Sequence, residues 1–129
     1  RPALDRGAVV VTDRFLDSSV AYQGAARDLG TEEVRDLSLW AVAGLLPDIT
    51  FLLDVSAEVS AERAVARTGG KLDRLERAGA DFHDAVREQY RLLAEREPDR
   101  FYILDASRTP EDLAAEISGV VTMLIEGQA

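Results

Sequence analysis

Three short apolar runs, separated by longer segments with helical periodicity, organise the chain. The runs are Ala8–Thr12, Ile49–Leu53 and Phe101–Leu104. A strand with one face in water alternates apolar and polar residues, so these nearly continuous runs indicate strands that are buried on both faces. Such strands are typical of a parallel sheet covered by helices. We therefore predict an α/β fold with three parallel strands.

The segments between these runs carry signals for the ends of helices. Hydroxyl residues that can cap a first turn precede acidic residues, and prolines follow the last apolar positions. A polar connector is predicted over Leu72–Gly79, which lacks apolar periodicity. The predicted helices run from Ser18 or Ser19 to Ala26, from Thr31 to the residues before Pro47, from Ser56 to about Arg67, from Asp81 to the residues before Pro98, and from Thr109 through Leu124.

An aspartate follows each predicted strand: Asp13, Asp54 and Asp105. Ligands of parallel α/β sheets bind beyond the carboxyl ends of the strands, so three carboxylates at one edge suggest a site for a polar ligand or a cation. Turn chemistry accounts equally well for Asp54 and Asp105, because aspartate side chains commonly hydrogen-bond the backbone of turns. A functional role is better supported for Asp13, because Arg14 follows it directly.

Composition narrows the classes of function. The 129 residues, 47% hydrophobic and 30% charged, suit one globular domain. The net charge of −9 argues against general nucleic-acid binding, which needs a positive surface. No apolar run approaches the roughly 18 residues that span a bilayer, and no signal peptide is recognisable, so we expect a cytoplasmic protein with no membrane partner. The lack of cysteine excludes disulfides and thiolate metal sites.

Arg14 mounts a guanidinium group at the end of the first predicted strand. Its planar fork can bind two oxygens of a phosphate, and Asp13 could orient it or accept a metal-bound water. The alternative is an Asp–Arg pair that closes a surface turn. Ser19, Tyr22 and Gln23 follow on one helical face, where they could hydrogen-bond the edge of a nucleobase and pack beside a sugar. The alternative for these three is a polar face with a half-buried tyrosine.

A second basic cluster surrounds a Gly-Gly pair, the composition expected of a mobile lid. Arginines brought over a phosphoryl group would neutralise the charge that develops during its transfer. The alternative is a solvated loop with local ion pairs. The cluster comprises Arg63, Arg67, Lys71, Arg74 and Arg77.

His83 is interpreted as a surface helix residue, and Trp40 and Phe82 as core or interface residues.

These motifs together resemble the thymidylate kinase family. The similarity covers essentially the whole chain in order, and it implies a three-layer, P-loop-kinase-like fold with a parallel sheet flanked by helices. The run from Asp13 to Gly24 is similar to the Asp-Arg-aromatic signature and substrate-binding helix of the family. The other matching segments are Leu46–Val55 for the P-D-x-x-x-x-L-D-V strand, Arg67–Glu76 for the lid, and Leu104–Ser107 for the strand and loop near the adenine site.

The resemblance implies transfer of the γ-phosphoryl group of ATP to thymidine monophosphate (dTMP), with Mg²⁺, by a homodimer. Arg14 would bind the acceptor phosphate, and Asp13 would hold the magnesium through water. Ser19 and Gln23 would read the thymine edge, while Tyr22 would pack against the deoxyribose. On the donor side, the implied residues are Arg63, Arg67 and Arg74 as lid cations and Ser107 and Arg108 beside the adenine.

One family feature is missing from the sequence, the phosphate loop G-x-x-x-x-G-K-[ST]. In the family, its strand lies centrally in the sheet, between the strands matched by Ala8–Thr12 and Ile49–Asp54. We therefore interpret residues 1–129 as the C-terminal portion of a nucleoside monophosphate kinase domain, with an acceptor-site segment at 13–24 and a lid at about 66–79.

We expect this portion to be inactive alone. Two alternatives stay open. One is another P-loop nucleoside or nucleotide kinase. The other is a non-catalytic nucleotide-binding or assembly module that has lost its phosphate loop.

Overall fold

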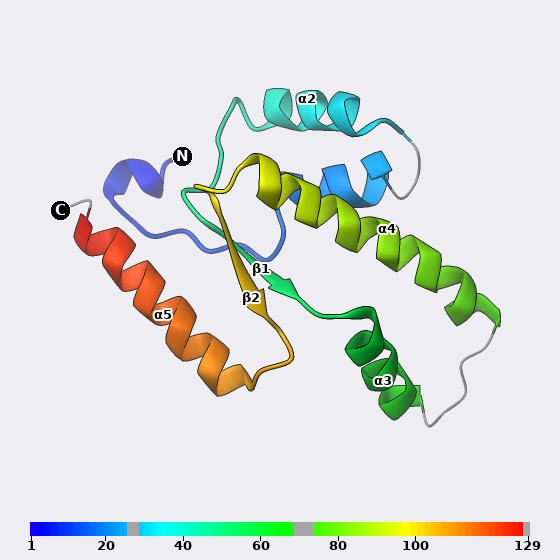
Figure 1. Cartoon of the computed structure of the whole chain (residues 1–129). Helices are drawn as coiled ribbons and strands as arrows, with labels where there is room; N and C mark the ends of the chain where they lie inside the picture. The colour runs from blue at the N-terminus through cyan, green and yellow to red at the C-terminus, as the bar shows by residue number, and fades with distance from the viewer. Residues whose placement is uncertain (26–28, 69–73, 128–129) are drawn as a thin grey trace. The chain divides into compact units, whose positions relative to one another are not determined.

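The computed structural model describes residues 1–25, 29–68 and 74–127 of the chain (Figure 1). The chain divides into two compact units, residues 1–45 and residues 46–129. The regular elements described in the first unit are all helical, and the second unit contains a parallel sheet with helices. No helix among the described residues is both long enough and apolar enough to cross a membrane.

The first unit consists of short helical segments: the 3₁₀ turn η1 (Leu4–Arg6), α1 (Leu16–Ser19), the π-helical η2 (Val20–Ala25) and α2 (Thr31–Ala41). α1 continues directly into η2, and both contact α2. Leu16, Val20 and Ala21 are buried. A Cβ atom at Gly24 would lie 2.9 Å from the Cα atom of Thr31, so only glycine lets η2 approach α2 this closely.

The prediction of a strand over Ala8–Thr12 is wrong. These residues have no regular secondary structure, and the exposed fractions of Val9, Val10 and Val11 are 62%, 55% and 90%. A strand needs a hydrogen-bonded neighbour, and the described part of the first unit contains no other strand to supply one. The apolar run therefore has strand propensity without a sheet to join, and Asp13 follows no strand.

The helix after Asp13 begins earlier than predicted. α1 starts at Leu16, with Phe15 as its N-cap residue, so Ser18 and Ser19 lie inside the helix and not at its cap. The predicted end at Ala26 lies outside the described residues. α1 is followed directly by η2, which is π-helical. The sequence pattern did not indicate this wider helical geometry.

α2 also differs from the prediction at both ends. Gly30, with φ +83°, is its N-cap residue, and Thr31 is the first helical residue and not the cap. The helix ends at Ala41, well before Pro47. Gly44 takes φ +69°, and its amide donates to the carbonyl oxygen of Leu39 at 2.8 Å, the backward bond of a glycine-terminated helix end.

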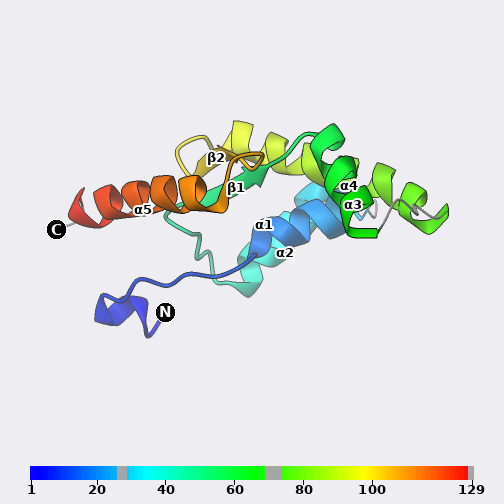
Figure 2. The ribbon, with the colours of Figure 1, turned by 90° about the horizontal axis from the view of Figure 1, so that it is seen from below.

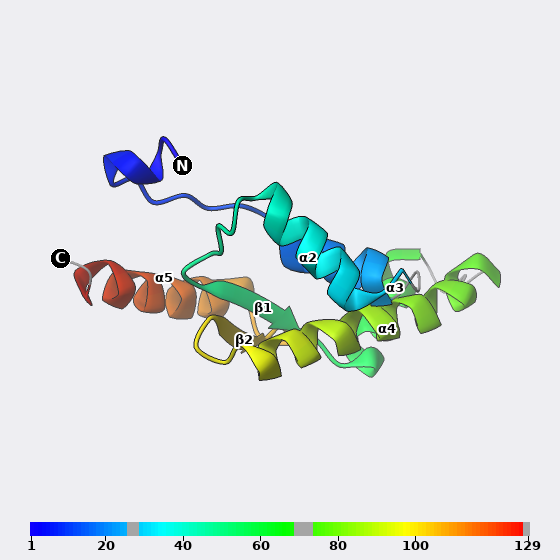
Figure 3. The same ribbon diagram turned by 90° about the horizontal axis from the view of Figure 1, so that it is seen from above.

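The second unit consists of β1 (Thr50–Asp54), α3 (Ala57–Thr68), α4 (Arg74–Arg96), β2 (Phe101–Asp105) and α5 (Pro110–Gly127). α3 and α4 connect the carboxyl end of β1 to the start of β2 (Figures 2 and 3). The two strands are parallel, and their register pairs Thr50 with Phe101 and Asp54 with Asp105. The second and third predicted strands, and their parallel direction, are confirmed. Their predicted burial on both faces is wrong, because Leu53 of β1 and Ile103 of β2 are each 54% exposed.

Two predicted helix starts in this unit are confirmed by their caps. The Ser56 hydroxyl accepts the Val59 amide at 3.3 Å, and the Thr109 hydroxyl accepts the Asp112 amide at 3.2 Å. The connector predicted over 72–79 is wrong from Arg74 onward, because α4 begins there. Leucine, arginine, glutamate and alanine dominate this stretch, and their high helix propensity does not depend on an apolar stripe.

The core of the second unit lies between α4 and β2. Val86 and Leu93 of α4 are buried, as are Phe101 and Leu104 of β2. Arg100 is also buried, and its guanidinium group lies 4.5 Å from the centroid of the Phe101 ring. Leu104 is thus buried directly before Asp105, the last residue of β2.

Candidate functional site

The first unit brings Arg14 and Tyr22 together. The Arg14 Nη2 atom donates to the Tyr22 hydroxyl at 3.2 Å, and the guanidinium carbon lies 4.9 Å from the centroid of the tyrosine ring. Arg14 has φ +66°, a left-handed conformation that non-glycine residues seldom adopt. Backbone outliers of this kind cluster at functional sites. The guanidinium group is thus held on an aromatic surface while remaining exposed to solvent.

The other predicted acceptor residues lie on the same segment. Asp13 is exposed next to Arg14, Ser19 is the last residue of α1, and Gln23 is exposed within η2. Because the segment passes from α-helical to π-helical geometry, the spacing of three and four residues no longer guarantees one face. Among the predicted acceptor residues, the hydrogen bond and the cation–π contact described join Arg14 to Tyr22.

The carboxyl ends of the strands hold Asp54 and Asp105 side by side, since they are register partners. Asp105 has a local role, because its Oδ1 atom accepts the Ser107 amide at 2.9 Å. Hydrogen bonds from the Ser107 hydroxyl and amide lower the pKa of Asp105 from its ordinary value. The interpretation of Asp105 as a turn residue is therefore the one that its contacts support.

The loop after β2 is anchored to α5 through Glu116. The Tyr102 hydroxyl donates to this carboxylate at 3.0 Å, and Arg108 forms an ion pair with it. The Arg108 hydrogen bond, and then that of Tyr102, lower the pKa of Glu116. The same contact raises the pKa of Arg108. Arg108 and Ser107, predicted to border a nucleotide, thus belong to a loop held by side-chain hydrogen bonds.

Asp54 has a different environment, which sequence reasoning missed. Arg87 of α4 donates to both of its carboxylate oxygens, from Nε at 2.7 Å and from Nη2 at 3.0 Å. This hydrogen bonding raises the pKa of Arg87. The two residues lie 33 positions apart, too far for any short motif to link them. The available signals were a strand that ends in aspartate and an arginine directly after Val86, a buried residue of α4.

Arg63 connects α3 to the same region. Its Nη2 atom donates to the Ala106 carbonyl oxygen at 2.9 Å, and the Ala106 amide donates to the Asp54 carbonyl oxygen at 2.7 Å. The helices on either side of the predicted lid are therefore both bonded to the carboxyl edge of the sheet, α3 through Arg63 and α4 through Arg87.

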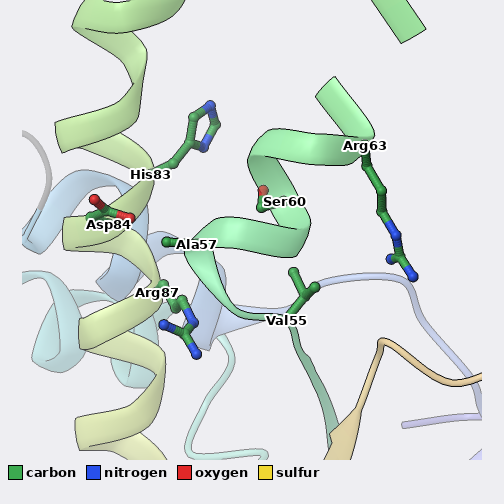
Figure 4. A pocket seen from close by; sticks show the side chains of 7 residues that line it. All are labelled: Val55, Ala57, Ser60, Arg63, His83, Asp84 and Arg87. Atoms are coloured by element: carbon green, nitrogen blue, oxygen red, sulfur yellow. The ribbon is translucent and has the colours of Figure 1, made fainter. Parts of the chain in front are cut away.

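A cavity of about 530 Å³ lies between α3 and α4. Figure 4 shows its side chains coming from facing turns of the two helices and from the residue after β1. His83 is exposed, as predicted for a surface helix residue, yet it also lines this cavity. The lining residues are Val55, Ala57, Ser60, Arg63, His83, Asp84 and Arg87.

The remaining predicted lid cations are only partly described. Arg67 belongs to α3 and Arg74 is the first residue of α4, so the backbone of each is helical. Their side chains, and Lys71 altogether, lie outside the described part of the structure. The prediction that these cations reach a phosphate group stays a prediction.

Trp40 is not a core residue, because 80% of its surface is exposed. Leu37, one turn earlier on α2, is 66% exposed. The alternative interpretation, that Trp40 belongs to an interface, is compatible with this exposure.

Comparison with known proteins identifies relatives along almost the entire chain. A family profile described as "Thymidylate kinase" matches residues 1–117. A protein named thymidylate kinase from Clavibacter michiganensis subsp. michiganensis is 54% identical over 130 residues, covering 100% of this chain and 61% of the relative. The thymidylate kinase of Leifsonia xyli subsp. xyli is 56% identical over 117 residues, covering 91% of this chain and 55% of the relative. The chain thus spans a little more than half the length of these curated relatives.

Proposed function

The chain belongs to the thymidylate kinase family, and we propose that the intact protein transfers the γ-phosphoryl group of ATP to dTMP, giving thymidine diphosphate for deoxynucleotide synthesis in the cytoplasm. The family has the P-loop kinase fold, with which the parallel α/β arrangement of the second unit agrees. The observation that carries the proposal within this chain is the exposed guanidinium group of Arg14, held against the Tyr22 ring.

The acceptor end of the reaction falls to the first unit. Arg14 binds the phosphate of dTMP, for which its planar fork is suited. Tyr22 already contacts this guanidinium group, and its ring would pack against the deoxyribose, where a ribose 2′-hydroxyl group would clash. Ser19 and Gln23 would hydrogen-bond the thymine edge. These roles separate a thymidylate kinase from other nucleotide kinases, because they select both the base and the sugar.

The donor end falls to the second unit. The loop holding Ser107 and Arg108 would border the adenine of ATP. Arg63, a candidate lid cation, already bonds this loop at the Ala106 carbonyl oxygen. Arg67 and Arg74 would lie over the phosphates and neutralise the charge that develops on the transferred group.

Magnesium fits the side chains of this chain only as an ion shared with the substrate. No group of three histidine, cysteine, aspartate or glutamate residues in the described ranges could hold a metal ion alone. Mg²⁺ commonly keeps its waters and binds through one or two carboxylates and substrate phosphates. Asp13, an exposed carboxylate beside Arg14, fits the role of a ligand through water. When bound, the ion would neutralise phosphate charge.

A homodimer is proposed for the intact protein, with α2 contributing to the interface. Leu37 and Trp40 expose large apolar side chains on this helix. The two residues lie one turn apart, and apolar side chains that adjoin on a surface mark contact surfaces between proteins when the patch is large.

The proposed activity is tested by a coupled assay of ADP release, with dTMP as acceptor, on the intact protein. A panel of other nucleoside monophosphates and of nucleosides serves as the control. Turnover that is highest with dTMP is the expected result. Preference for another acceptor would instead support a different P-loop kinase. No turnover with any acceptor, together with retained nucleotide binding, would support a non-catalytic binding module.

A further inference from the structure

The β2–α5 loop, residues 106–109, connects the carboxyl end of β2 to the start of α5 (Figure 1). At the start of the loop, the Ala106 amide donates to the Asp54 carbonyl oxygen at 2.7 Å. Further along, the Arg108 guanidinium group forms a hydrogen bond and an ion pair with Glu116 of α5. The first attachment belongs to the main chain, whereas the attachment to α5 is made by side chains.

The position of Glu116 is fixed in turn from the sheet. The Tyr102 hydroxyl of β2 donates to the Oε1 atom of Glu116 at 3.0 Å, while Arg108 bonds the Oε2 atom. The Tyr102 ring packs edge-to-face against Phe51 of β1, with the ring centroids 5.8 Å apart. Phe51 and Tyr102 are register partners on the two strands. A chain of contacts therefore runs from the sheet through Glu116 to the side chain of Arg108.

One carboxylate thus joins the residues on the two sides of the chain turn after β2. Tyr102 precedes Asp105, the last strand residue, and Arg108 follows it. The Arg108 hydrogen bond, and then that of Tyr102, lower the pKa of Glu116, which keeps both oxygens available as acceptors. The side chains of Arg108 and Glu116 are 40% and 30% exposed. Because solvent screens such a pair, its contribution to stability is modest. The main consequence of the contact is the direction that it gives to the loop.

We propose that Glu116 is a positioning residue for the donor nucleotide: by holding Arg108 against α5, it keeps the β2–α5 loop in the conformation that borders the adenine of ATP. The inference rests on the proposed function, which puts Ser107 and Arg108 beside the adenine. Glu116 acts through Arg108 and does not touch the nucleotide. A loop that is ordered before ATP binds loses less conformational freedom on binding. The contact therefore raises the affinity for ATP and leaves the transfer step unchanged.

The kinetic test uses Glu116→Ala in the intact protein, since alanine is the strongest helix former and preserves α5. The control is Glu126→Ala, which removes an exposed glutamate near the other end of the same helix. We expect Glu116→Ala to raise KM for ATP about 3- to 10-fold, the effect of releasing one long side chain. Both kcat and KM for dTMP should stay within about twofold of the parent, and Glu126→Ala should change none of the three. Partial unfolding would lower kcat at constant KM for ATP, and that result, or an unchanged KM for ATP, would overturn the proposal.

Two further variants test the route through which Glu116 acts. Tyr102→Phe keeps the ring against Phe51 but removes the hydroxyl that braces the carboxylate. It should raise KM for ATP less than Glu116→Ala does, and a larger rise would contradict this order of contacts. Arg108→Met combined with Glu116→Ala should have the KM for ATP of Arg108→Met alone, because the two side chains work as one unit. A further rise in the double variant would show a route that bypasses Arg108, and the proposal would then be wrong.

Two measurements without an acceptor separate this proposal from the proposed activity. In calorimetry, Glu116→Ala should raise the Kd for ATP by the same factor as KM. In hydrogen exchange, the Ser107 amide, which donates to the Asp105 Oδ1 atom at 2.9 Å, should exchange faster in Glu116→Ala, while the β2 amides keep their rates. If the intact protein phosphorylates no acceptor, the proposed function fails, while the ATP affinity and the loop exchange still judge Glu116. An unchanged Kd, or an unchanged exchange of the loop, in a folded Glu116→Ala variant would overturn the positioning role.

Discussion

The close approach of η2 to α2 predicts that Gly24→Ala destabilises the first unit. The new Cβ atom would lie 2.9 Å from Thr31 Cα, 3.2 Å from its Cγ2 atom and 3.3 Å from the Gly30 carbonyl oxygen. The first distance is shorter than real Cβ contacts, and two of the three atoms belong to the backbone, which cannot rotate away. The helices must therefore separate. Overpacking of this kind costs about 1–3 kcal/mol.

A part of this cost is offset by helix propensity. Alanine is favoured over glycine by roughly 0.5–1 kcal/mol inside a helix. The net destabilisation expected for Gly24→Ala is therefore about 0–2.5 kcal/mol. Gly119→Ala on α5 is the matched control, because nothing lies within 4 Å of a Cβ atom at this position. Only the propensity term acts there, so the control should stabilise α5 by roughly 0.5–1 kcal/mol.

Native-state hydrogen exchange measures both effects in their own elements. Gly24→Ala should speed the exchange of α2 amides, and Gly119→Ala should slow that of α5 amides. If Gly24→Ala slowed exchange as Gly119→Ala does, α2 would yield to the methyl group without cost, and the argument from close approach would be refuted.

Other predictions concern the acceptor residues, the acid response and assembly. Arg14→Lys removes the fork, and KM for dTMP should rise about 10- to 100-fold in steady-state kinetics, from the ~1.5–3 kcal/mol of a charged hydrogen bond; Arg6→Lys is the control that should not change KM. Tyr22→Phe keeps the ring but loses the hydroxyl 3.2 Å from Arg14, so its rise in KM should be smaller, and an equal rise would contradict the contact. The pKa of Glu116 is lowered in the folded chain, so its stabilisation is present above the ordinary value of 4.5 and lost as pH falls through the lower folded pKa. Glu116→Gln should flatten the acid decline of Tm, and an unchanged decline would show that other groups dominate. Trp40→Glu should weaken dimers in sedimentation, and a dimer of undiminished stability would exclude this part of α2 from the interface.

The elements of the second unit were predictable because their signals are local. Apolar runs ending in aspartate located β1 and β2, and the hydroxyls of Ser56 and Thr109 located two helix starts, because a cap bonds an amide only three residues away. The start of α4 at Arg74 was not predictable from periodicity, since that stretch becomes helical through propensity alone.

The errors in the first unit have a common cause. Val9-Val10-Val11 has the composition of a buried strand, but strand formation depends on a neighbour that a run of residues cannot supply for itself. The Arg87–Asp54 pair was missed for a related reason, because it too depends on a partner that is distant in the sequence. It forms between residues 33 positions apart, so no local sequence pattern indicates it. Arg14 and Tyr22 were each singled out from the sequence because they lie on one short polar segment, but the contact between them was not predicted.

The exposed valines of residues 9–11 have a practical consequence for work with this chain in solution. A short β-branched stretch without charge, open to solvent, is a ready template for pairing with another extended backbone. Molecules of residues 1–129 should therefore self-associate at high concentration. Turbidity that rises with concentration would then reflect aggregation through this stretch and not biological assembly.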